Sequence, residues 1–332
     1  MDHVFGKIFK DGRFDLPQIC EEKNFEGKLK DLYDSYIELL MENKFSEVGE
    51  IDNSCKDIIE AVEYYHNGFP HKAFEKIKDI MEKLIEKPLN IYAKTSWYED
   101  FLREEDLLKL YRMRSVDEVK EYEIEDIFHI PYNLRAKISS NRYSISGYPS
   151  LYLSTSLELC KQELKKNEKI IVSQFLIKKT QPTFNVKVLE LALKPKDFFK
   201  TNKSGRFFHD LNISAVKEKY FFWYPIILAC SFERKNKNDP FSSEYIVPQL
   251  IMQWLRVYYE TKKTLMGIRY FSCASKEASE LGFNYVFPAS GKKAKNKEFC
   301  EILAKSFKFT KPELFEYNDE ITIENRKFIQ MR

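Results

Sequence analysis

The chain has 332 residues, of which 43% are hydrophobic and 15% aromatic, enough to build a sizeable core. Its 54 basic and 51 acidic residues leave a net charge of +3, so the composition predicts no global field for binding nucleic acid. The six cysteines are scattered without a C-x-x-C pair, which argues against a zinc cluster and indicates reduced thiols in a cytoplasmic protein.

Residues 1 to about 90 are expected to be helical. Apolar residues recur at helical spacing between Leu29 and Leu40, and again on one side of a later segment that ends before Pro88. Gly68 is a stop signal for a middle helix, and Pro70 suits the first turn of the next. We therefore predict an all-α domain over residues 1–100, followed by a second domain over residues 101–332.

In the second domain, strands and helices follow one another without regular βαβ spacing, which favours an α+β fold. The predicted strands are 169–178, 186–193, 267–272 and 284–288, and a helix is predicted over 244–259. No G-x-G-x-x-G or G-x-x-x-x-G-K motif is present, so a Rossmann or P-loop nucleotide site is not indicated. The apolar run 220–232 is too short to cross a bilayer, and we expect no membrane partner.

The segment 141–163 organises this second domain. Gly147 and Pro149 predict a turn, and a short apolar strand, 151–153, follows it. Thr155 is a suitable helix N-cap, with Glu158 three residues later to complete a capping box. The helix that follows is expected to run through residue 165.

This helix separates two glutamates. On a 3.6-residue period, Glu163 shares a face with Leu159 and Cys160, whereas Glu158 falls on the opposite, solvated face. We therefore expect the carboxylate of Glu163 to point inward, beside the strand that carries Tyr152. The alternative is an acid at the margin of an amphipathic helix, because charged residues are rarely buried without a partner.

Three separated blocks resemble the RES family, which is named for an arginine, a glutamate and a serine. The first block carries an arginine on a strand. The second, central block carries an Arg-aromatic step, a G-x-P-x-L-Y-L segment and a glutamate. The third block carries a Y…Q…G-I-x-Y-x-S pattern. The matching residues are Leu110-Tyr111-Arg112; Arg142-Tyr143, Gly147–Leu153 and Glu163; and Tyr245, Gln249 and Gly267–Ser272. Asn141 departs from the pattern, because the family usually has glycine there.

The resemblance implies a mixed α/β fold similar to the ADP-ribosyltransferases. It also implies an enzyme that cleaves the nicotinamide–ribose bond of NAD and passes ADP-ribose to phosphate, water or a protein acceptor. Family members are often toxins or defence effectors, so an antitoxin or immunity protein is an expected partner, and a homo-oligomer is an open alternative. NAD is expected as substrate, and no metal is expected.

Such chemistry passes through an oxocarbenium-like sugar, which needs a carboxylate near the ribose and cationic groups for the pyrophosphate. Through the resemblance, Glu163 is assigned to the ribose, Arg112 and Arg142 to phosphates or the acceptor, and Tyr152 and Ser272 to substrate contacts. The implied catalytic residues are Glu163, Arg112 and Ser272, and the implied substrate-binding residues are Arg142, Tyr143, Tyr152, Tyr245 and Gln249.

The N-terminal region resembles the helical module that precedes many RES domains and is grouped with HEPN-like folds. A HEPN ribonuclease needs an arginine and a histidine a few residues apart. Here the histidines are His3, His66 and His71, and the only arginine is Arg13, so no such pair exists. A structural or partner-binding role is therefore favoured for this module. The alternative for the whole chain is a non-catalytic RES-fold module that acts through a protein partner.

Limited proteolysis tests the predicted domain boundary. Because the helical pattern ends at Pro88 and the family match begins at Leu110, a protease should cut first between about residues 88 and 106. The cut sites are read by mass spectrometry of the fragments. Resistance in this region, together with cleavage inside 220–232, would contradict the two-domain interpretation.

Overall fold

The structure is a computed structural model of the chain. It describes residues 2–10, 12–20, 24–89, 109–164, 168–177, 187–199, 213–236, 239–262, 264–290, 298–323 and 327–329. The chain forms two compact units: unit 1 joins Met1–Ile91, Asn141–Tyr143 and Glu190–Trp254, and unit 2 joins Tyr92–Ser140, Ser144–Leu189 and Leu255–Arg332. The predicted boundary at residue 100 lies outside the described residues and stays a prediction.

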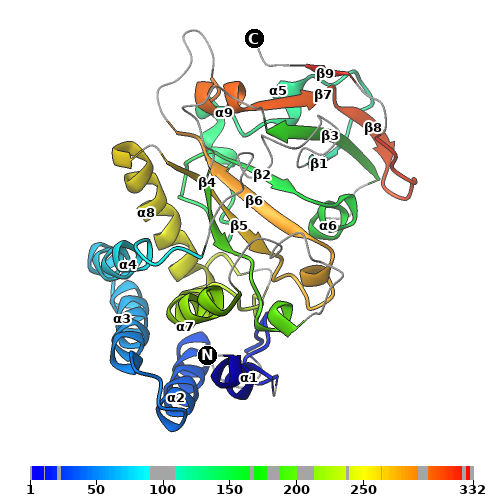
Figure 1. The fold of residues 1–332 in the computed structure, drawn as a ribbon. Helices are drawn as coiled ribbons and strands as arrows, with labels where there is room; N and C mark the ends of the chain where they lie inside the picture. Colours follow the sequence, from blue (N-terminus) through cyan, green and yellow to red (C-terminus); the bar gives the residue numbers. More distant parts are fainter. Residues whose placement is uncertain are drawn as a thin grey trace. The chain divides into compact units, whose positions relative to one another are not determined.

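The described part of unit 1 is mainly helical, as predicted for the first 90 residues (Figure 1). Gly68 follows α3 with φ +79°, a conformation that favours glycine, and Pro70 is the first residue of α4. The sequence signals for these two helix ends are therefore confirmed. The helices are α1 (Asp2–Phe9), α2 (Phe25–Glu42), α3 (Val48–His66), α4 (Pro70–Leu84) and α7 (Ile213–Ala229).

Helix α7 is buried along most of its length and contains Pro225. Proline has no N–H, so the carbonyl of Phe221, four residues earlier, loses its helical donor. The hydroxyl of Tyr36, on α2, donates a hydrogen bond to this carbonyl at 2.9 Å. The hydroxyl of Tyr33 donates to the carbonyl of Pro225 at 2.7 Å. In helix geometry this carbonyl also accepts from the amide of Ala229. Two tyrosines of α2 thus support the interrupted helix.

The strands form a nine-stranded sheet within the described residues. Its order is β4-β5-β6-β2-β1-β3-β7-β9, and β8 also pairs with β3. The four predicted strands correspond to β3, β4, β5 and β6, and the α+β class is confirmed. The strands are β1 (Lys109–Val116), β2 (Ser150–Ser154), β3 (Lys169–Ile177), β4 (Lys187–Leu191), β5 (Leu265–Phe271), β6 (Phe283–Pro288), β7 (Phe307–Thr310), β8 (Glu313–Glu316) and β9 (Phe328–Ile329).

Alternation along the strands builds a core on each side of the sheet. Leu110 of β1 belongs to a large apolar cluster with Leu151 and Phe287, whereas Met113, three residues later, packs with Val172 in a smaller one. Helix α6 (Leu157–Glu163) contributes partly buried side chains to this smaller cluster. The other helices are α5 (Ile124–Ile127), α8 (Ile246–Lys262), which starts in unit 1 and ends in unit 2, and α9 (Glu301–Ser306).

A buried histidine stands beside the large cluster. His129 is fully buried; its Nε2 accepts from the Cys300 amide at 2.8 Å, and its Nδ1 lies 2.8 Å from the Ile130 carbonyl. An acceptor at Nε2 and a donor at Nδ1 describe a neutral imidazole. Burial, with a small contribution from the charge of Arg112, lowers the pKa of His129 to about 4, although the hydrogen bond with the Ile130 carbonyl acts in the opposite direction.

Removing the hydroxyl of Tyr36 should destabilise unit 1. Tyr36→Phe leaves the buried Phe221 carbonyl without a donor, so we expect the free energy of unfolding to fall by about 1–3 kcal/mol. Tyr33→Phe is the matched control, because its acceptor keeps the helical amide, and we expect a loss of about 1 kcal/mol or less. Denaturant unfolding of both variants is the measurement. A larger loss of unfolding free energy in Tyr33→Phe than in Tyr36→Phe would contradict the role assigned to Tyr36.

His129 should make stability fall in acid. Its pKa is near 6.5 unfolded and about 4 folded, so its contribution is complete above pH 6.5 and is lost as pH falls towards 4, about 3 kcal/mol in total. His129→Gln removes the titration and should flatten the dependence of unfolding free energy on pH over that interval. Urea unfolding at several pH values measures it, and an unchanged slope in the variant would refute the assignment.

Candidate functional site

The eight predicted site residues fall into two sets, one in each unit. Unit 2 contains Arg112, Tyr152, Glu163 and Ser272; unit 1 contains Arg142, Tyr143, Tyr245 and Gln249. The first set includes all three residues that the resemblance made catalytic.

Helix α6 positions Glu163, and it begins one residue later than predicted. Its N-cap is Ser156, whose hydroxyl accepts from the amide of Leu159 at 3.1 Å. Thr155, the predicted cap, instead pairs with the first residue of β6: its hydroxyl accepts from the amide of Phe283 at 2.8 Å, and its own amide donates to the Phe283 carbonyl. The prediction of Thr155 as N-cap was wrong because a neighbouring strand takes that hydroxyl.

Glu163 is the last residue of α6, and its carboxylate reaches the sheet. Oε1 accepts a hydrogen bond of 2.7 Å from the side-chain amide of Asn284, on β6. Asn284 is only 4% exposed, whereas the Glu163 residue as a whole is exposed, as is Glu158. The prediction that the helix face buries Glu163 is therefore corrected: the carboxylate is anchored to the sheet at one oxygen but remains on the surface.

Charged and polar groups gather where β1, β2 and α6 meet. Asn284 is opposite Ser154 on β2, and Ser154 is opposite Tyr111 on β1. The thiol of Cys160, on α6, lies 3.6 Å from the Tyr111 carbonyl. Burial, and to a smaller extent the charge of Glu163, raise the pKa of Cys160 to about 12, although Ser154 and Arg112 act in the opposite direction.

Arg112 inserts its guanidinium beside β2. Nη1 donates to the carbonyl of Tyr152 at 2.7 Å, while Nε is buried without a hydrogen-bond partner among the described residues. Burial lowers the pKa of Arg112 to about 10, with a smaller lowering by the charge of Arg114. The group is therefore still a cation at neutral pH, next to the strand that carries Tyr152.

Ser272 comes directly after β5 and is almost fully buried. Its hydroxyl accepts from the amide of Ala274 at 3.3 Å. Because Phe271 is paired with Phe283, Ser272 lies at the end of the sheet where β6 begins and β2 ends. Arg112 on β1 and Ser272 after β5 belong to two strands of one sheet that β2 and β6 separate, and Glu163 is on the helix that follows β2.

The second set is engaged in the packing of unit 1. The guanidinium of Arg142 donates to the carbonyls of Cys230 and Phe232, at 3.0 and 2.6 Å, and stands over the ring of Tyr245 at 5.1 Å. These contacts hold the chain that leaves α7. Gln249 donates to the Asn141 carbonyl at 3.0 Å, and Tyr143 is buried. Roles in substrate binding stay predictions for all four residues.

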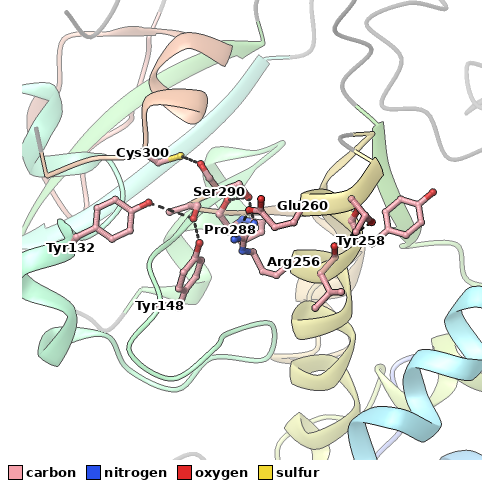
Figure 2. A network of polar contacts seen from close by, with 11 residues as sticks. Tyr132, Tyr148, Arg256, Tyr258, Glu260, Pro288, Ser290 and Cys300 are labelled. Carbon is pink, nitrogen blue, oxygen red and sulfur yellow. Dashed lines mark hydrogen bonds and ion pairs between the residues drawn. The ribbon is translucent and has the colours of Figure 1, made fainter. Parts of the chain in front are cut away.

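A separate polar network secures the far end of β6 (Figure 2). The hydroxyls of Tyr132 and Tyr148 both donate to the carbonyl of Ala289, the first at 3.5 Å. Arg256 donates to the hydroxyl of Ser290 at 3.0 Å and stands over the Tyr148 ring at 5.2 Å. These contacts fix the position of β6, the strand that carries Asn284.

Sequence reasoning missed Asn284. Its signal was a polar amide at the start of the otherwise apolar strand 283–288, but that pattern does not reveal a partner 121 residues away. Within the described residues, no group of three or more His, Cys, Asp or Glu side chains is placed to hold a metal ion. The described helices also include none with the length and hydropathy required to cross a membrane.

The chain is 27% identical over 308 residues to a Bacillus subtilis (strain 168) protein named "Putative toxin YopC". The alignment covers 88% of this chain and 66% of that protein, so the chain spans just under two thirds of its relative's length. No protein-family model matches the chain. No solved structure matches it either.

Proposed function

We propose that this protein is an NAD-consuming toxin of the RES type, which cleaves the nicotinamide–ribose bond. The observation that carries the proposal is the surface carboxylate of Glu163, which the side-chain amide of Asn284 anchors to the sheet. The three-block resemblance to RES proteins supports the chemistry. The similarity to a protein named as a toxin supports the biological role.

In the proposed reaction, the bond between C1′ of the ribose and the nicotinamide nitrogen breaks, and the electron pair leaves with neutral nicotinamide. The positive charge that develops on the ribose is stabilised by the carboxylate of Glu163. Phosphate, water or a protein side chain then attacks C1′ and loses a proton, which completes the transfer of ADP-ribose. Electrostatic stabilisation of this kind lowers the barrier because it is stronger in the transition state than in the bound substrate.

The remaining roles follow from chemistry. Arg112 is a partly buried cation, and its planar guanidinium suits a pyrophosphate or an anionic acceptor. Tyr152 offers an aromatic face, and Ser272 offers a hydroxyl at the same end of the sheet. In this proposal the enzyme works in the cytoplasm, where an antitoxin or immunity protein restrains it.

One observation favours the second candidate, a non-catalytic module that acts through a protein partner. Arg142, Gln249 and Tyr143, three of the predicted substrate-binding residues, have structural roles in unit 1. Purified protein incubated with NAD, with and without phosphate, separates the candidates. Release of nicotinamide supports the enzyme, and the mass of the second product identifies the acceptor.

Substitution of Glu163 tests the mechanism. Glu163→Gln keeps the shape of the side chain and an oxygen that can accept from Asn284, but removes the charge. We expect kcat for nicotinamide release to fall about 10²–10³-fold or more, with a smaller change in KM, because the lost interaction acts mainly in the transition state.

Glu158→Gln is the matched control, since it removes the same charge from an exposed position on the same helix. Its turnover should stay near that of the wild type, and thermal melting should show that both variants are folded. Equal turnover in two folded variants would remove the basis for the role of Glu163.

A further inference from the structure

We propose that Asn284 is the positioning residue for the catalytic carboxylate: its side-chain amide holds Glu163 in the orientation that faces the ribose. The inference rests on the proposed function and extends it to a residue on another element. Its basis is the 2.7 Å hydrogen bond from Nδ2 of Asn284 to Oε1 of Glu163.

The location of Asn284 is unfavourable unless the side chain has a task. The residue is 4% exposed and lies on β6, paired with Ser154 on one side and Tyr270 on the other. Asparagine is depleted in strands, and a buried amide must be hydrogen-bonded to offset its loss of water. The donor bond that the structure gives this amide goes to the carboxylate of Glu163.

Glu163 needs such an anchor because of where it stands. It is the last residue of α6, and Leu164 leaves the helix in an extended conformation. The exposed carbonyls at a helix C-terminus disfavour a carboxylate, and an exposed glutamate side chain has several accessible rotamers. A donor on a strand that is paired on both sides selects one of these rotamers, because that strand is rigid.

Loss of the anchor should therefore reduce turnover through Glu163. Asn284→Ala removes the donor without touching the carboxylate itself, and we expect kcat for nicotinamide release to fall about 10–100-fold with KM little changed. A residue that served only the fold would lower thermal stability but would leave the kcat of the folded fraction unaltered.

Asn284→Asp gives a sharper readout. The introduced aspartate is isosteric; when it is ionised it repels Glu163, and when it is protonated its O–H replaces the lost donor. The activity of this variant relative to wild type should therefore be lowest at neutral pH and recover as the pH falls. The other titratable or charged groups of this region are Glu158, Cys160 and Lys161 on α6, Arg112 and Tyr111 on β1, Tyr152 on β2 and Tyr270 on β5. They are the same in both proteins, so the comparison cancels them.

Thr155→Val is the control for damage to the start of β6. It removes the hydroxyl that accepts from the amide of Phe283, the residue before Asn284. We expect a loss of thermal stability with nicotinamide release close to that of the wild type.

The outcomes separate this inference from the proposed function. An active wild type, with unchanged kcat in Asn284→Ala and no acid recovery in Asn284→Asp, overturns the role of Asn284 and leaves the function standing. If the wild type releases no nicotinamide, the proposed function fails, and crystal structures of wild type and Asn284→Ala decide the positioning. A carboxylate that moves or becomes disordered in the variant supports it, and an unmoved carboxylate overturns it.

Discussion

The pairing of β6 with a strand on each side determines how the candidate site is built. Five register pairs join β6 to β2, and four join it to β5. The approach is so close that a Cβ on Gly267 would lie 2.5 Å from the Val286 carbonyl, so only glycine fits there. Because both neighbouring strands are fixed, the first two residues of β6 have defined partners. The backbone of Phe283 pairs with Thr155, and the side-chain amide of Asn284 donates to Glu163 on α6. The orientation of the Glu163 carboxylate follows from the second of these contacts.

This arrangement divides the two charges of the site between different supports. The carboxylate is on a seven-residue helix at the surface, and the guanidinium of Arg112 is set into the sheet against a backbone carbonyl. A partly buried cation is less solvated than a fully exposed one, so its attraction for an approaching anion is screened less by water. An exposed carboxylate keeps its hydration until substrate covers it. In the proposed site, the guanidinium of Arg112 would therefore attract an anion before it binds, whereas the carboxylate of Glu163 would act only on bound substrate.

Local signals in the sequence were sufficient for the elements but not for the partners of polar side chains. Gly68 and Pro70 indicated helix ends because their backbone preferences are intrinsic, and the strands were recognisable from alternating apolar residues. Thr155 and Ser156 are equally good caps in isolation; only the presence of β6 decides between them. Likewise, the sequence around Arg142 does not predict that its guanidinium donates to two backbone carbonyls after α7. Hydrogen bonds between distant segments are the information that local patterns lack.

The tyrosines of α2 that support α7 have a consequence for the integrity of the chain. Tyr33 and Tyr36 bind carbonyls nearly two hundred residues away, inside the same unit. A backbone break between α4 and β1 would leave these hydrogen bonds and the apolar contacts around them intact. The two pieces would then migrate as one particle in a native separation and come apart only in denaturant. The first four helices would thus stay bound to α7 without a covalent link. Expressed alone, they would expose the surface that α7 covers.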